Sequence, residues 1–275
     1  MRLILRYVTC LAALIGGVVS VAASAQASPF TLDDNYYGGT DTWNYPSDVI
    51  GEQDIFGIDS AVIQRIDGGN TLEVTINTNF AGMPGAPGTY GIGYGALFIT
   101  PGANAWTPQG SGPNYTTDTY QAGDWAYAAT IPMDPGSTTS APGAFYSTGD
   151  GTIVMSNVYG NETTYPYRGN NGYYFRQGQA VQFNPSGSPV PNTSESWSID
   201  AAANTITFYI ADYGLLGDQF ALSWAMTCGN DIIQGQVSLD PTDPTPVPEP
   251  ATFSLMAAGI AFAGALRMRR SRKMH

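Results

Sequence analysis

Apolar and polar residues alternate along much of the chain after residue 57, in short segments of five to ten residues. The clearest segment is residues 71–80, where Leu72, Val74 and Ile76 fall on one face and mostly polar residues fall on the other. Clusters of Gly, Pro, Asn and Asp separate the segments, and no stretch of ten or more residues repeats with the period of a helix. The pattern predicts an all-β protein.

The alternation predicts about ten strands, at residues 61–66, 71–80, 94–100, 124–130, 151–156, 173–175, 180–183, 197–200, 204–210, 219–228 and 235–239. The turn at residues 67–70 joins the first two of these strands into a hairpin. The segment 219–228 carries the bulkiest apolar face, so we expect it at the centre of the core. This number of strands fits a single β-sandwich, jelly-roll-like, over residues 28–240. Long Gly- and Pro-rich loops are expected at residues 81–93, 101–123 and 132–149.

The N-terminal residues have the pattern of a signal peptide. Two arginines precede an apolar stretch at residues 8–21, and Ala25 and Ala27 supply the small residues that signal peptidase accepts at positions −3 and −1. We therefore expect Sec export, with signal peptidase removing residues 1–27.

The C-terminal residues combine three features in order. Pro248, Glu249 and Pro250 end a Pro-rich spacer at residues 241–250, and an uncharged run follows at residues 251–266. The chain then ends in a basic tail that contains Arg267, Arg269, Arg270, Arg272 and Lys273. As a helix the uncharged run covers about 24 Å, somewhat less than a hydrocarbon core of roughly 30 Å. Residues 251–275 are therefore expected to form a short transmembrane helix with a cytoplasmic basic tail.

This three-part tail resembles the PEP-CTERM sorting signal of Gram-negative bacteria. The resemblance implies that an exosortase recognises the tail, that the precursor is anchored transiently in the inner membrane, and that the tail is then removed. The protein would reach the cell surface or the extracellular space. An ordinary C-terminal anchor is the alternative, but it explains only the apolar run and the basic end and gives no reason for Pro-Glu-Pro.

The charge of the body restricts its partners. Between the two processing segments, three arginines accompany twenty-one carboxylates, a formal net charge of −18, and there is no lysine. Such a surface repels nucleic acid, whereas an acidic polysaccharide bridged by divalent cations remains a partner. Cys228 is the one cysteine after residue 27, so an internal disulfide is excluded, and its strand context predicts that it is buried.

Catalysis by histidine is excluded from the body, because the single histidine is His275 at the end of the basic tail. Ser-His-Asp and Cys-His triads and His-based zinc sites are excluded with it. A pair of carboxylates could still hydrolyse a glycoside, but no motif distinguishes two of the acids from the others. We therefore expect no enzyme.

Calcium is the one candidate ion, and no other cofactor is expected. Asp33 and Asp34 near the mature N-terminus, and Asp231 after the central strand, offer the hard oxygen ligands that calcium prefers. The alternative is turn chemistry, since Asp beside Asn or Gly is common in tight turns.

Two groups of loop aromatics are candidates for stacking on sugar rings: Tyr36, Tyr37 and Trp43 near the start, and Tyr165 and Tyr167 in the middle. Packing is the alternative, because Tyr and Trp rings also cover apolar surface within the protein while their polar groups stay in contact with water.

Together these features predict an exported surface or matrix protein, structural or adhesive, associated with exopolysaccharide or a biofilm. The alternative is a carbohydrate-active enzyme or a carbohydrate-binding module that uses paired carboxylates and loop aromatics. An Asp or Glu pair lining an aromatic cleft would favour the alternative.

Overall fold

The structure is a computed structural model, and it describes residues 28–38, 48–83, 92–109, 115, 117–131, 141–156, 168–169, 172–173 and 176–239. These residues belong to one compact unit, residues 26–243. The predicted signal peptide, the predicted spacer and the predicted membrane helix all lie outside the described residues. Among the residues that are described, no helix is both long and apolar enough to cross a membrane.

The regular secondary structure of the described residues is almost entirely β, which confirms the predicted class. Strands β1 to β7 are Phe30–Asp33, Ile58–Ile66, Thr71–Thr78, Leu97–Pro101, Tyr127–Thr130, Ala141–Ser147 and Gly151–Met155. Strands β8 to β14 are Arg168–Gly169, Gly172–Tyr173, Ala180–Pro185, Ser194–Asp200, Thr205–Ala211, Gln219–Ala225 and Ile232–Ser238. One four-residue helix, α2 (Gln53–Phe56), and the 3-10 turns η1 (Asp67–Gly69) and η3 (Thr148–Asp150) complete the described elements.

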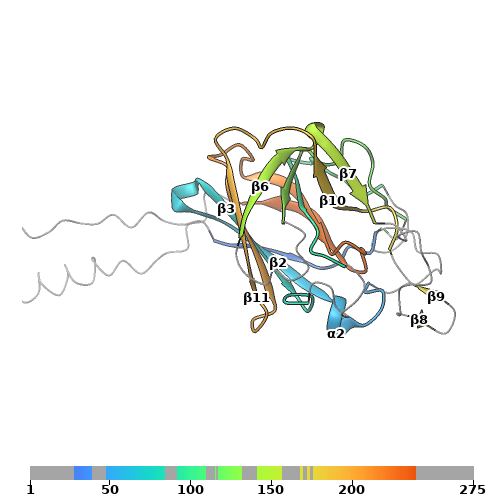
Figure 1. Cartoon of the computed structure of the whole chain (residues 1–275). Coiled ribbons are helices and arrows are strands. Elements are labelled where there is room, and N and C mark those ends of the chain that lie inside the picture. The colour runs from blue at the N-terminus through green and yellow to red at the C-terminus, as the bar shows by residue number, and fades with distance from the viewer. Residues whose placement is uncertain are drawn as a thin grey trace, which may run out of the picture. The chain divides into compact units, whose positions relative to one another are not determined.

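Ten strands form one antiparallel sheet in the order β1-β2-β3-β12-β11-β6-β5-β4-β13-β14 (Figure 1). The two strands at the ends of this order, β1 and β14, also lie against each other. Leu32 of β1 packs directly on Gly235 of β14, where an added Cβ would come within 2.7 Å of the leucine side chain. We expected two packed sheets, whereas the ladders give one sheet that curls until it is nearly a barrel.

Strand β6 connects the two halves of this sheet, although the sequence pattern predicts a loop there. Its first part pairs with β11, through Gly143 opposite Glu195, and its second part pairs with β5, through Phe145 opposite Ala129. The loop prediction is therefore wrong for residues 141–147. The reason is that Ala-Pro-Gly-Ala at residues 141–144 shows no alternation from which a strand could be recognised.

The predicted hairpin between β2 and β3 is confirmed, with Arg65 opposite Leu72 and Ile66 opposite Thr71. Its turn uses backbone angles that glycine adopts easily, with φ of 67° at Gly68 and 93° at Gly69. The hairpin places β3 between β2 and β12 in the sheet.

Strand β13 lies in the core, as predicted, and it is buried on both faces. Phe220 and Trp224 lie in the larger apolar cluster, whereas Ala221 and Ala225 lie in a second cluster on the opposite face. The separate two-stranded sheet of β7 and β10 contributes residues to this second cluster. Cys228 is 5% exposed, so the prediction that it is buried is also confirmed.

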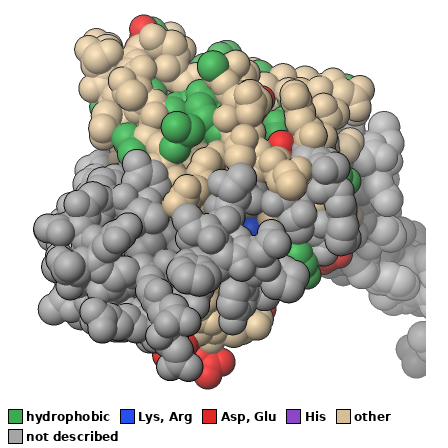
Figure 2. Space-filling model, turned by 90° about the vertical axis from the view of Figure 1, so that its right-hand side faces the viewer, with side chains coloured by type: hydrophobic (Ala, Val, Ile, Leu, Met, Phe, Trp, Pro, Cys, Tyr) green, Lys and Arg blue, Asp and Glu red, His purple; other side chains and the backbone are tan. Residues whose placement is uncertain are grey.

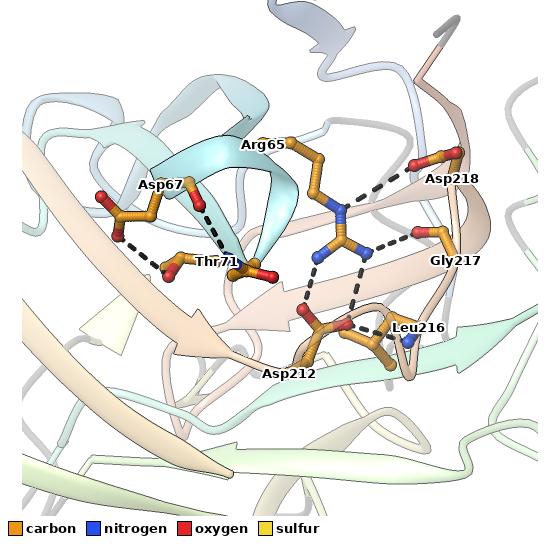
Figure 3. A network of polar contacts seen from close by, with 8 residues as sticks. Arg65, Asp67, Thr71, Asp212, Leu216, Gly217 and Asp218 are labelled. Atoms are coloured by element: carbon orange, nitrogen blue, oxygen red, sulfur yellow. Dashed lines mark hydrogen bonds and ion pairs between the residues drawn. The ribbon is translucent and has the colours of Figure 1, made fainter. Parts of the chain in front are cut away.

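Arg65 forms the centre of a polar network beside the hairpin (Figure 3). Its guanidinium pairs with Asp212 through both terminal nitrogens, and Nη2 also donates to the carbonyl of Gly217 at 2.6 Å. Asp212 in turn accepts the backbone N–H of Leu216 at 2.8 Å. The side chain of Asp218 lies 4.0 Å from Arg65 Nε. These contacts satisfy a buried charge pair and fix the loop that leads into β13.

Candidate metal centre

Three aspartates from distant parts of the sequence meet at one end of the boundary between β1 and β14. Asp34 directly follows β1, Asp48 begins the segment before α2, and Asp231 directly precedes β14. One carboxylate oxygen from each aspartate lies within 4.8 Å of the other two. The structure thus brings together two of the predicted ligands, Asp34 and Asp231, and adds Asp48.

Asp33 does not belong to this group. It is the last residue of β1, it is exposed, and it stands opposite Ser60 of β2 in the ladder. Successive residues of an extended chain point to opposite sides, which explains why one of two adjacent aspartates reaches the cluster.

Asp231 is held rigidly. Its side chain is completely buried, Oδ2 accepts the backbone N–H of Ile58 at 2.6 Å, and Oδ1 accepts the N–H of Ile232 at 2.9 Å. Each carboxylate oxygen has more than one lone pair, so both hydrogen bonds leave acceptor capacity toward the other aspartates.

The segment that carries Asp48 is fixed against the turn before Asp231. The N–H of Ile50 donates to the backbone carbonyl of Asn230 at 2.8 Å. The side chain of Asn230 is 2% exposed, and its carbonyl oxygen Oδ1 has no hydrogen-bond partner. A buried amide oxygen therefore lies next in sequence to Asp231 and packs beside the segment of Asp48, with an unused acceptor site.

Arg176 is the buried cation of this region, and it binds backbone carbonyls. It donates to Gly229 at 3.2 Å, to Gly38 at 2.8 Å and to the carbonyl of Asp48. Within the part of the chain that the structure describes, neither a hydrogen bond nor an ion pair joins Arg176 to the three carboxylates. The guanidinium thus ties the surrounding segments together and leaves the carboxylate oxygens to other partners.

The carboxylates lie in an environment that disfavours three negative charges. Burial, together with the charges of its neighbours, raises the pKa of Asp34 well above its usual range, and burial also raises the pKa of Asp231. Burial raises the pKa of Asp48 to about 6, although Arg176 opposes the shift. Both oxygens of Asp34 and Oδ1 of Asp48 are buried without a hydrogen-bond partner. The backbone N–H of Tyr36 favours the charged Asp34 electrostatically without forming a regular hydrogen bond.

This arrangement suits a hard divalent cation. Three carboxylates and one guanidinium leave a formal charge of −2, which one divalent ion neutralises. The available donors are carboxylate oxygens, a set typical of calcium and unlike the nitrogen and sulfur ligands of zinc. Asp48 was not among the predicted ligands, because it lies in a segment without alternation and its sequence neighbours give no sign that it meets Asp231.

The aromatic residues proposed for sugar stacking do not form an exposed group in the described residues. Tyr36 is 3% exposed, its hydroxyl donates to Asp118 at 2.7 Å, and its ring packs on Trp106 and Tyr115. Tyr36 is therefore a packing residue, and its stacking assignment is corrected. Tyr37 is half-buried. The other candidates, Trp43, Tyr165 and Tyr167, lie outside the described residues, as do Ala25 and Ala27 of the predicted cleavage site.

The comparison with protein families concerns the C-terminal residues, which also lie outside the described part. The family model described as the PEP-CTERM protein-sorting motif matches residues 246–271. No curated protein and no solved structure matches the chain. The matched span includes Pro248, Glu249 and Pro250 with most of the basic tail, while Arg272 is the next residue after it. The motif implies export, processing by an exosortase and a membrane-anchored stage before the surface. The chain therefore carries a PEP-CTERM protein-sorting motif at its C-terminal end, as the sequence resemblance predicts.

Proposed function

We propose that this protein is a structural or adhesive component of the cell surface or extracellular matrix, and that its folded domain binds calcium through Asp34, Asp48 and Asp231. The observation that carries the proposal is the buried group of three carboxylates, with oxygens that have no protein partner, in a chain that carries a sorting motif. A bound divalent ion would supply the positive charge that these oxygens lack.

The electrostatics of the domain favour a structural role that depends on cations. The body carries a net charge of −18 without any lysine. On the face drawn in Figure 2, little positive charge is visible among the described residues, while acidic and apolar side chains are both exposed. Two polyanions associate only when cations screen or bridge them, so binding to an acidic exopolysaccharide would require divalent ions.

The alternative, a carboxylate-based glycoside hydrolase, has one observation in its favour. The carboxylates of the cluster are separated by less than 4.8 Å, close to the roughly 5 Å of retaining enzymes. Asp231, however, is completely buried, and a carboxylate that hydrolyses a glycoside must contact the sugar. A pocket of about 750 Å³ lies elsewhere, beside the Arg65 network, and its lining contains one carboxylate, Asp218, and no aromatic side chain. Neither place offers the paired carboxylates and stacking rings that the alternative uses.

Calorimetry on the exported protein tests the cation site. The protein is dialysed against chelator and titrated with calcium chloride, with magnesium chloride in a parallel titration. We expect one calcium ion per chain, and a large loss of affinity in Asp34→Asn and Asp48→Asn. Asp33→Asn is the matched control, because it removes the same charge one residue away from Asp34 and outside the cluster. Absence of calcium binding to the wild type would reject the site.

Cosedimentation with the producer's own acidic polysaccharide tests the matrix role. We expect association in calcium, and release by a chelator at constant ionic strength. Binding that the chelator leaves unchanged would reject cation bridging, and shortened polysaccharide chains would show that the protein is an enzyme.

A further inference from the structure

We infer that the cation at this centre holds the barrel closed, so that the N-terminal strand β1 is fixed against β14 only when the ion is bound. The inference rests on the proposed calcium site and assigns a structural consequence to its occupancy. It follows from the position of the three aspartates relative to the two end strands of the sheet.

The first step is that no ladder joins β1 to β14. Among the described strands, β1 pairs with β2 and β14 pairs with β13, although the two end strands lie against each other. Their contact is made by side chains, as where Leu32 packs on Gly235. A boundary without backbone hydrogen bonds is the weakest line in a closed sheet, since each ladder bond that is absent would have added to its stability.

The second step is the location of the cluster at one end of this boundary. Asp34 follows the last residue of β1, and Asp231 precedes the first residue of β14. Asp34 lies near Asp231, and Leu32 packs on Gly235. Residue numbers therefore fall along β1 while they rise along β14, so the two strands run in opposite directions where they touch. An ion bound by Asp34 and Asp231 would therefore link the two strands directly where the ladder does not.

The third step is that β1 itself is short and only partly buried. It has four residues, its residues alternate between half-buried and exposed, and its ladder with β2 spans only Phe30 to Asp33. Short segments with few buried contacts are the ones that open first in a native protein.

The third ligand extends the link to the segment before α2. Asp48 sits on the segment that Asn230 and Arg176 hold, and Arg176 also binds the carbonyl of Gly38, in the segment after β1. Ion binding would thus join three segments that the polar contacts already place around one point. Extracellular calcium modules bind with Kd of roughly 10⁻⁴ to 10⁻³ M, a range in which the outside calcium concentration decides occupancy.

Hydrogen exchange with mass spectrometry tests the inference on the exported protein, in calcium and in chelator. At calcium ten times the Kd measured by calorimetry, linkage predicts about tenfold slower exchange at residues 30–34. Residues 67–70 in the exposed β2–β3 turn can exchange by local motion without opening the site, so they are the internal reference and should exchange equally in both conditions. Asp33→Asn should keep the calcium effect, while Asp34→Asn should abolish it and exchange like the wild type in chelator.

The possible results separate the two proposals. Calcium binding by calorimetry with unchanged exchange at residues 30–34 overturns the closure of the barrel and leaves the calcium site standing. Equal added protection at residues 30–34 and at the turn residues 67–70 also overturns it, because the ion would then have no particular effect on β1. Absence of calcium binding overturns both proposals. The wild-type comparison alone decides the matter if the Asp34 variant does not fold.

Discussion

Glu195 faces Gly143 across the β11–β6 ladder, and its carboxyl group occupies the space where a side chain at residue 143 would lie. A Cβ added to Gly143 would come within 1.5 Å of Glu195 Oε2. Glu195 is 4% exposed, neither of its carboxyl oxygens has a hydrogen-bond partner, and burial raises its pKa to about 8. The folded protein therefore carries this group largely as the neutral acid at pH 7.

The raised pKa of Glu195 makes stability depend on pH in a defined direction. The folded protein holds the proton up to about pH 8, while the unfolded chain releases it near 4.5. The contribution of the neutral carboxyl is fully present below pH 4.5 and is lost as pH rises from there through 8. Between pH 4.5 and pH 7 this loss lowers the free energy of unfolding by about 3 kcal/mol. Glu195→Gln removes this titration. The free energy of unfolding of the variant, relative to that of the wild type, should therefore rise between pH 4.5 and pH 8, as measured by urea unfolding at several pH values. A difference that is constant from pH 5 to pH 8 would contradict the assignment.

Gly143 is expected to tolerate no side chain. In Gly143→Ala the new methyl group meets the Glu195 carboxyl and lies 2.7 Å from the backbone oxygen of Thr130, which cannot move without disturbing the β5–β6 ladder. Overpacking of this kind costs about 1–3 kcal/mol. Gly149→Ala is the control, because the nearest atom to its added Cβ is 3.5 Å away. Equal denaturation midpoints for the two variants would refute the close approach at Gly143.

Trp224 is a central residue of the larger core. It is completely buried and stands opposite Ile233 in the β13–β14 ladder. Trp224→Ala should lower the free energy of unfolding by roughly 3–5 kcal/mol, which is enough to unfold a domain of ordinary stability. The fraction folded is measured by circular dichroism and by denaturant titration. A loss below about 1 kcal/mol would show that the core does not depend on this ring.

The elements that sequence predicted best are those whose signal is local. Alternation located β3, β12 and β13, because apolar residues at every second position give a strand one apolar face. It did not indicate that the opposite face of β13 is buried too, since the residues there are small and a second cluster covers them. Strand β6 was missed because residues 141–144 have no apolar alternation, and its position is fixed by pairing on both sides.

The closure of the sheet could not be predicted, since it depends on contacts between residues about 200 positions apart, such as Leu32 and Gly235. The candidate metal centre was found in part for the same reason. Asp34 and Asp231 lie next to strands, where the sequence indicates candidate oxygen ligands beside turns. Asp48 lies in a segment without alternation, and only the folded structure brings it to the other two aspartates. Asp33 was included because sequence alone does not say which of two adjacent aspartates points toward the cluster.

The sorting motif predicts where the C-terminus of the mature protein lies. If an exosortase processes the chain at the matched residues, material recovered outside the cell should lack residues beyond about Glu249. Glu249→Gln should leave uncleaved precursor in the inner membrane, because it changes the central residue of Pro-Glu-Pro while keeping its size. Replacing the terminal arginines with glutamine should do the same by removing the charges that keep the tail in the cytoplasm.

Intact-mass spectrometry of the membrane and extracellular fractions measures both effects, in strains with and without the exosortase. Asp243→Asn is the matched control, since it removes a negative charge from the Pro-rich spacer just before the matched residues 246–271. It should be processed like the wild type, because residue 243 lies outside the matched residues. Extracellular protein that still contains residues 251–266 would reject exosortase processing and would leave the C-terminal segment as an ordinary anchor.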